Sequence, residues 1–254
     1  MTTAVLDRPR AGTTSIIDRR PPLARLTALE IRKSLSTRSG RTLAGAAAVL
    51  PAVALAILLA LGQKPGTAPE MLGVLGTLVA MLMIAVGVLS TAGEWTHGTM
   101  QTTFLTVPAR GRVLTAKYAG MALLGAAICA VVVASTFAVA AVGAGAGFSW
   151  AGTGVAIVAT IAGGAAMTVV GAGIGAAVAN APAAITGTYV TLLVALPVLH
   201  AARPAWANKL DPLQATSDLI SGATGAVRPM AILAGWVLVT AIAGTVVTRR
   251  RAIS

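Results

Sequence analysis

Six long apolar stretches dominate the sequence, and each is close to the length that a helix needs to cross a lipid bilayer. A transmembrane helix requires about 20 predominantly apolar residues. Inside the bilayer every backbone polar group must be satisfied within the protein, so only helices and closed barrels can span it. We therefore predict an all-α, polytopic membrane protein with six transmembrane helices. The stretches are Thr42–Gly62, Met71–Ala92, Tyr118–Val142, Gly152–Val178, Ala183–Leu199 and Met230–Thr248.

The basic residues lie mostly on one side of these stretches. Fifteen of the nineteen Lys and Arg residues fall before the first stretch, between the second and the third, or after the last. The other four are Lys64, Arg203, Lys209 and Arg228. Lys and Arg are enriched in cytoplasmic loops. Both termini and the connection between the second and third helices are therefore predicted to be cytoplasmic.

The composition excludes two broad classes of protein. Hydrophobic residues make up 56% of the chain and charged residues only 10%, which is too little charge to cover a soluble protein of 254 residues. The net charge of +12 could indicate nucleic-acid binding. However, the basic residues flank the apolar stretches, where membrane orientation and anionic lipid explain them. Membrane lipid is an expected partner and nucleic acid is not.

The six stretches define a transmembrane domain over residues 42–248. Residues 1–21 are rich in Arg, Thr and Pro and are predicted to be a disordered cytoplasmic tail. At the other end, residues 249–254 form a basic cytoplasmic C-terminus.

Residues 22–41 are predicted to form an amphipathic helix at the membrane interface. Leu23, Leu26 and Leu29 recur at every third position, and basic residues gather near the end of the segment. The alternative is a flank that only anchors the first span.

The fourth apolar stretch is rich in small residues. Gly171 and Gly175 form a G-x-x-x-G pair, which lets two helix backbones approach closely. The pair could pack inside this chain or against another subunit, and the sequence favours neither.

The external segment 200–229 carries the signals of a helix start and a helix end. Asp211 precedes Pro212, and Gln214 follows three positions after Asp211, as at a capped helix N-terminus. Gly222 is a typical helix end. We therefore expect short external helices before the sixth span.

Apolar side chains in this external segment predict where it rests. Trp206, Leu210 and Leu213 are spaced as on one helical face, and Leu213, Leu219 and Ile220 belong to the predicted helix itself. We expect these residues to lie against the outer ends of the spans or on the outer leaflet.

Several kinds of chemistry are missing. The six stretches contain no Asp, Glu, Lys, Arg or His, whereas ion-coupled transporters usually keep an ionisable residue in the bilayer. Backbone carbonyls can also bind Na⁺, so this class is weakened rather than excluded. There is no phosphate-binding P-loop motif, and His97 and His200 are the only histidines. The chain is therefore not expected to be an enzyme or to hold a metal or cofactor.

The cytoplasmic connection Gly93–Lys117 is too long for a tight turn. Met100, Phe104 and Val107 lie at positions i, i+4 and i+7 and would give a short helix an apolar stripe. Such a helix could lie on the inner leaflet or dock in a groove of a cytoplasmic partner.

This connection resembles a known family. Its order of residues is similar to the E…GT…P.xR…K pattern of type-2 ABC transporter permeases, the membrane subunits of ATP-binding-cassette (ABC) exporters. The layout is also similar, with a basic lead-in, six spans, a cytoplasmic loop after the second span and a helical external segment before the sixth. The matching residues are Glu94, Gly98, Thr99, Pro108, Arg110 or Arg112, and Lys117.

The resemblance implies a function and partners. The connection would be the coupling helix, with Glu94, Gly98, Thr99, Pro108, Arg110 and Lys117 forming the contact with an ABC ATPase or its frame. Two ATPase copies, which bind ATP and Mg²⁺, would drive a pair of identical or related permease chains in the plasma membrane. The uncharged spans favour an amphiphilic or hydrophobic substrate, such as a drug, an antibiotic or a lipid-like molecule. No substrate-contacting residue is indicated.

Three residues of this motif also have a simpler interpretation. Glu94 could cap the start of a loop helix, and Arg112 and Lys117 could only anchor a span at the headgroups. Two other function classes remain open: an ion-coupled secondary transporter, and a membrane scaffold or assembly protein that transports nothing.

Overall fold

The computed structural model describes residues 22–100, 110–223 and 225–251. Over these residues every regular element is a helix, and six helical segments are long and apolar enough to cross a membrane. The prediction of an all-α, polytopic membrane protein with six spans is confirmed. The spans are α2 (Arg38–Ala60), α3 (Ala68–Thr96), α5 (Arg110–Gly143), α6 (Thr153–Val178), the segment Ala181–Ala202, and α11 (Val227–Arg250).

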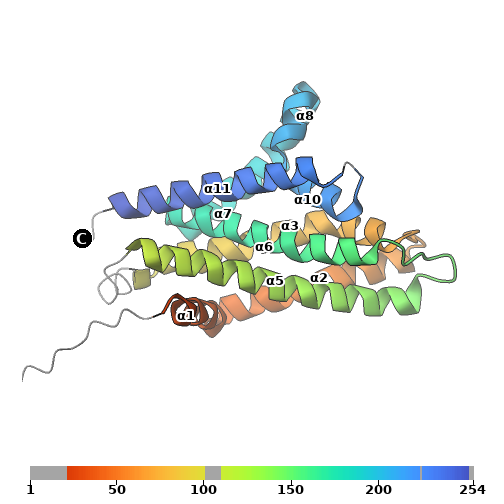
Figure 1. The fold of residues 1–254 in the computed structure, drawn as a ribbon, viewed down its shortest axis with the longest axis horizontal. Helices are drawn as coiled ribbons and strands as arrows, with labels where there is room; N and C mark the ends of the chain where they lie inside the picture. The colour runs from red at the N-terminus through yellow and green to blue at the C-terminus, as the bar shows by residue number, and fades with distance from the viewer. Residues whose placement is uncertain (1–21, 101–109, 224, 252–254) are drawn as a thin grey trace, which may run out of the picture.

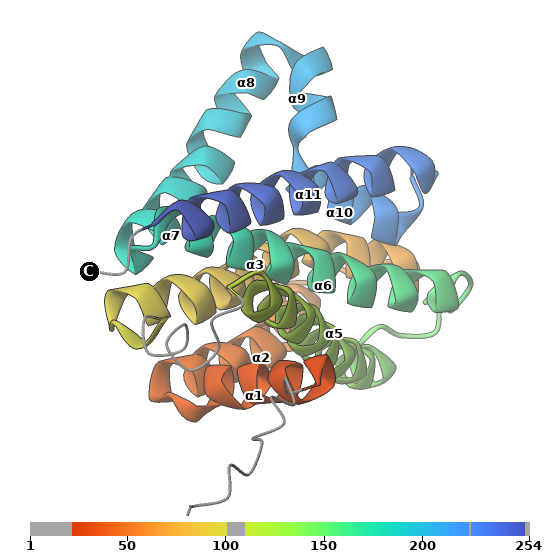
Figure 2. The ribbon, with the colours of Figure 1, turned by 60° about the vertical axis from the view of Figure 1, so that its left-hand side comes forward.

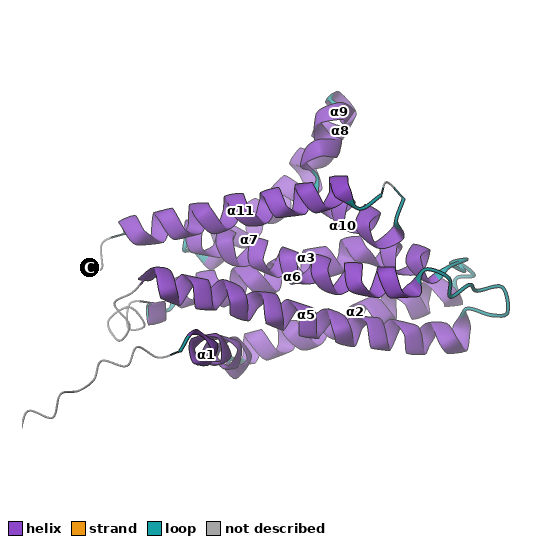
Figure 3. Ribbon diagram, in the orientation of Figure 1, coloured by secondary structure: helices purple, strands orange, loops and turns teal. Residues whose placement is uncertain are grey.

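Helices α2, α3, α5, α6 and α11 run side by side, whereas the C-terminal part of the Ala181–Ala202 segment points away from them (Figures 1 and 3). Helix α6 is central, because it packs against α3, α5 and α11. Helices α3 and α6 are largely buried, whereas α2, α11 and the fifth span expose most of their surface. Protein surrounds α3 and α6, and a bilayer would surround the more exposed helices. Both environments are apolar, which explains why all six helices are apolar.

The glycine pair of α6 is used inside the chain. A Cβ atom on Gly171 would lie 2.1 Å from the carbonyl oxygen of Ile84, and one on Gly175 would lie 2.8 Å from that of Val88. On the facing helix, a Cβ on Gly87 would lie 2.0 Å from the oxygen of Thr168. The backbones of α3 and α6 are therefore in contact. The sequence left open whether the glycine pair packs inside this chain or against another subunit, and the structure shows that it packs against α3 of the same chain.

Helix α1 (Leu23–Ser36) lies crosswise to the spans; it is seen end-on in Figure 1 while they run horizontally. The predicted leucine stripe does not face the protein, since Leu23 and Leu29 are exposed. Thr27 and Glu30 are buried instead. The crosswise direction is the one that an interfacial helix adopts, and its position at the headgroups stays a prediction.

The fifth span is bent. It consists of α7 (Ala181–Val190), a π-helical turn (Thr191–Ala195) and α8 (Leu196–Ala202). Pro197 has no N–H and cannot donate a helical hydrogen bond to the preceding turn. The π-helical turn accommodates this missing bond. Helix α8 and the following α9 (Pro204–Leu210) project from the bundle as an arm (Figure 2).

Helix α10 (Pro212–Ser221) confirms the predicted start after Asp211 and the predicted end at Gly222, but the side chain of Gln214 donates to Asp218 and not back to the cap. Asp211 Oδ1 accepts hydrogen bonds from the amides of Leu213 and Gln214 at 2.8 and 3.0 Å. Gly222 ends the helix with a left-handed φ of 72°, which glycine adopts at little cost.

The external apolar residues do not form one stripe. Trp206 and Leu210 belong to α9 and are exposed, because the chain breaks at Asp211 before α10 begins. Leu213 and Ile220 are buried and Leu219 packs against the same core, where α10 contacts α3, α6 and α11. These three residues therefore rest against the spans.

Candidate functional site

Four charged side chains meet at the cytoplasmic end predicted for the bundle. Lys117 on α5 is fully buried, and its ammonium donates to Glu30 on α1 and to Glu94 on α3. The distance from Lys117 Nζ to Glu94 Oε1 is 2.7 Å. Lys33 on α1 pairs with the other oxygen of Glu94 at 3.0 Å. We name Glu30, Lys33, Glu94 and Lys117 the charge cluster.

The charge cluster joins three helices that are far apart in the sequence. A buried ammonium is costly unless opposite charges compensate it, and removing one partner of such a pair strongly destabilises the fold. Two carboxylates on two other helices supply this compensation for Lys117. The charge cluster therefore holds α1, α3 and α5 together as one unit.

The structure corrects the interpretation of both ends of the connection Gly93–Lys117. Helix α3 continues to Thr96 and α5 begins at Arg110, so Glu94 and Lys117 lie on helices and not in a loop. Lys117 is not a headgroup anchor, because α1 covers this part of α5 and provides Glu30 as a partner. Glu94 lies in the last turn of α3 and so does not cap the N-terminus of a helix.

The Gly-Thr pair of the motif terminates α3. Gly98 has a φ of 69°, and its amide donates to the carbonyl of Trp95. The Thr99 hydroxyl donates to the carbonyl of Glu94 at 3.3 Å. Both residues satisfy carbonyl groups that a helix end leaves without partners.

The predicted docking stripe is only partly described. Met100 is fully buried against Val113 and Leu114 of α5, so it does not belong to an exposed stripe. Phe104, Val107 and Pro108 lie outside the described residues, and their role in an ATPase contact stays a prediction.

At the same end of the bundle, two arginine side chains donate hydrogen bonds to carbonyl groups at the ends of other helices. The Arg110 guanidinium, at the start of α5, donates to the carbonyl of Arg251 at 2.8 Å, just beyond the end of α11. Arg251 in turn donates to the carbonyl of Ala177 in the last turn of α6 at 2.8 Å. Its guanidinium also lies 5.1 Å from the ring centroid of Trp95. These bonds satisfy helix C-terminal carbonyls with positive charge.

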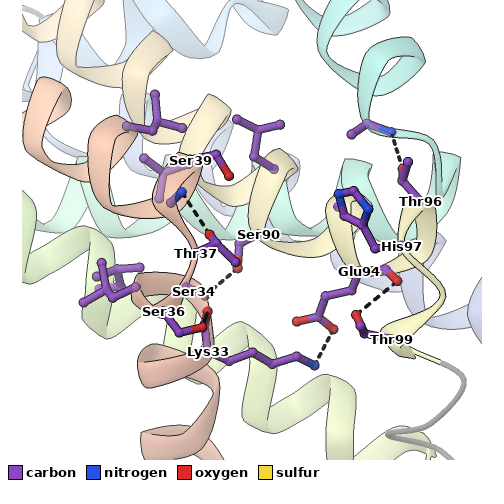
Figure 4. A pocket seen from close by; sticks show the side chains of 18 residues that line it. Lys33, Ser34, Ser36, Thr37, Ser39, Ser90, Glu94, Thr96, His97 and Thr99 are labelled. Atoms are coloured by element: carbon purple, nitrogen blue, oxygen red, sulfur yellow. Dashed lines mark hydrogen bonds and ion pairs between the residues drawn. The ribbon is translucent and has the colours of Figure 1, made fainter.

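A cavity of about 440 Å³ adjoins the charge cluster (Figure 4). Its walls come from the elbow between α1 and α2, the C-terminal half of α3, Leu124 of α5 and the start of α7. Hydroxyl groups of Ser34, Thr37, Ser39 and Ser90 line one side, and Figure 4 shows Thr96 and His97 across the open space from them.

Sequence reasoning missed Glu30, Lys33 and the serines of this cavity. One signal was available, because Glu30 is the only acidic residue in the otherwise basic segment 22–41. Burying a carboxylate costs free energy unless a positive charge compensates it. A lone acidic residue in this segment, if buried, therefore needs a partner on another element. Within the described ranges, no three His, Cys, Asp or Glu side chains gather as a candidate metal site.

No known protein family and no curated protein matches the chain.

Proposed function

We propose that this chain is the membrane subunit of an ABC exporter. Two permease chains, identical or related, would line a pathway in the plasma membrane, and a separate ATPase with two nucleotide-binding domains would drive it. ATP and Mg²⁺ would bind to that partner. The chain itself would catalyse no reaction.

The observation that carries the proposal is the charge cluster. The connection between α3 and α5 is the segment that would meet the ATPase, and Glu94 and Lys117 flank it. Both residues bind each other, and Lys117 also binds Glu30 on α1. A displacement of the connection would therefore move α1, α3 and α5 together, which is what a coupling element requires.

A second feature supports an apolar or amphiphilic substrate. A cavity of about 370 Å³ opens between α6, α7 and α11, and no charged residue lines it. Ile84, Val170, Ile174 and Trp236 make up much of its wall, with the hydroxyls of Thr188 and Thr191 as its polar groups. Such a lining favours a drug, an antibiotic or a lipid-like molecule over a small ion.

The decisive experiment is copurification of an ABC ATPase with the chain in mild detergent, followed by substrate-stimulated ATP hydrolysis by the complex in liposomes. The control is Phe104→Asp, which should lose the ATPase while the permease still inserts. A chain that never associates with an ATPase would leave the proposal without support and favour a scaffold.

One observation favours a second candidate, an ion-coupled secondary transporter. The predicted apolar stretches lack ionisable residues, but the helices extend beyond them and bury Lys117 with two carboxylates. Buried ionisable groups in membrane proteins often form proton or ion pathways. Uptake by the chain alone in liposomes, driven by a pH or Na⁺ gradient and absent without the gradient, would support this candidate and argue against an ATP-driven one.

A further inference from the structure

We propose that the cavity beside the charge cluster binds the headgroup of an acidic phospholipid from the cytoplasmic leaflet. The proposal uses the predicted topology and the cavity itself, and it does not depend on an ATPase or on transport.

The first argument is the order of polarity along the cavity. Leu43, Val86, Leu89 and Leu124 all line it. Leu43 lies farther along α2 from the predicted cytoplasmic end than Thr37 and Ser39 of the elbow, and Val86 and Leu89 lie farther from it along α3 than Ser90, Glu94 and Thr96. A polar mouth and an apolar depth match the orientation of an inner-leaflet lipid, whose headgroup faces the cytoplasm and whose chains point to the bilayer centre.

The second argument is charge. Among the described residues that line the cavity, Glu94 is the only carboxylate, and it already pairs with Lys33 and Lys117. The elbow also forms the N-terminus of α2, where the helix dipole favours an anion. Arg38 and Arg41 are exposed on the same turn of chain. Lys33 and Glu94 offset each other in the lining, so the α2 N-terminus and the nearby Arg38 and Arg41 supply the positive potential at the cavity mouth. The cytoplasmic leaflet is the one that carries anionic lipid.

The third argument is the set of hydrogen-bond donors. The Thr37 hydroxyl accepts the amide of Gly40 at 3.0 Å, so its own hydrogen is available to another acceptor. Ser39 and His97 lie on opposite sides of the open space in Figure 4. Hydroxyl and imidazole donors that converge from two sides suit the several oxygens of a phosphate group.

The test blocks the cavity without disturbing the packing. Gly93 lines the cavity, and a Cβ atom built on it meets no atom within 4 Å, so Gly93→Leu adds bulk where there is space. Gly235→Leu is the matched control, because Gly235 also lies on a span with nothing within 4 Å and does not line this cavity. The full-length chain would be purified in detergent, mixed with phosphatidylglycerol or phosphatidylcholine of the same acyl chains, and examined by native mass spectrometry.

We expect the wild-type chain and Gly235→Leu to retain phosphatidylglycerol in preference to phosphatidylcholine. Gly93→Leu should reduce phosphatidylglycerol binding by about tenfold, the factor that corresponds to a loss of 1.4 kcal/mol. A second variant, Ser39→Ala with His97→Ala, keeps the space and should remove the preference between the two lipids. It serves as the test if Gly93→Leu fails to fold.

Three results would overturn the proposal. The first is equal retention of the two lipids by the wild-type chain. The second is unchanged phosphatidylglycerol binding in both Gly93→Leu and the double variant. The third is displacement of the lipid by inorganic phosphate at millimolar concentration, which would mean that the site recognises a free anion and not a lipid.

Discussion

The ammonium of Lys117 and the carboxylate of Glu94 lie 2.7 Å apart although 23 positions separate them in the chain. The contact brings together the two ends of the connection between α3 and α5. Replacing Lys117 by Met should therefore destabilise the protein by about 3–5 kcal/mol, because Glu30 and Glu94 lose the buried ammonium that they share. Thermal unfolding in detergent measures the effect.

The control for this substitution is Lys64→Met, which removes an exposed ammonium and should change the unfolding temperature little. Adding Glu30→Gln to Lys117→Met should recover part of the loss, because one uncompensated buried charge disappears. Wild-type stability in Lys117→Met alone would contradict the structural role of the charge cluster.

Met100 and Phe104 should differ in what their loss affects. Met100→Asp places a carboxylate in the fully buried contact with Val113 and Leu114, and it should lower the amount of folded permease in the membrane. Phe104→Asp should leave that amount unchanged and reduce ATPase copurification. Immunoblots of membranes and of the purified complex compare the two. Equal losses of folded permease in both variants would argue that residue 104 also packs inside the chain.

Replacing glycine by alanine should have opposite effects at Gly171, where α6 touches α3, and at Gly45 on α2. Gly171→Ala should destabilise the protein by about 1–3 kcal/mol, because its Cβ would meet the Ile84 carbonyl and the helices must separate. Gly45→Ala should stabilise α2 by about 0.5–1 kcal/mol, since nothing lies within 4 Å of its Cβ and alanine favours a helix. Unfolding temperatures in the same detergent show whether each substitution stabilises or destabilises the protein. An unchanged unfolding temperature in Gly171→Ala would refute the close contact.

The external helix α10 should affect transport and not ATPase binding. Asp211→Ala removes the acceptor of the Leu213 and Gln214 amides and should cost about 1 kcal/mol of local stability. Leu213→Asp should impair export, because Leu213 is buried against the spans. Export and ATPase copurification are measured on the same preparation of the Leu213→Asp variant. Loss of the ATPase while the amount of the chain in the membrane stays normal would mean that α10 lies on the cytoplasmic side.

The predicted topology is tested by single cysteines in a Cys129→Ala background. Cysteines at positions 64 and 209 should react with an impermeant maleimide in intact cells, and a cysteine at position 97 should react only after the membrane is opened. His97, Lys64 and Lys209 are all exposed, so accessibility within the protein does not limit the reaction. Labelling at position 97 from outside would invert the arrangement.

The sequence predicted the features that depend on local patterns. Long apolar runs gave the six spans, and the Asp-Pro start and glycine stop gave α10 nearly to the residue. These succeed because a lipid environment requires hydrophobic length and because caps involve neighbours in the chain.

The features that depend on contacts between distant segments were not predictable. Lys117 was expected in the ATPase contact or its frame, or at the headgroups, because nothing in the sequence indicates that α1 folds over α5 and supplies Glu30. Met100 matched the spacing of an exposed stripe and is buried against α5. For Gly171 the spacing indicated a close helix contact, but only the structure identifies α3 as the partner.

The position of Arg251 affects how the protein should be handled. Its backbone carbonyl binds Arg110, and its side chain binds the end of α6, so this residue connects the ends of α5, α6 and α11. An affinity tag inserted shortly after Arg251 would lie next to this junction. A tag at the N-terminus, or a long flexible spacer before a C-terminal tag, would keep purification chemistry away from the three helix ends.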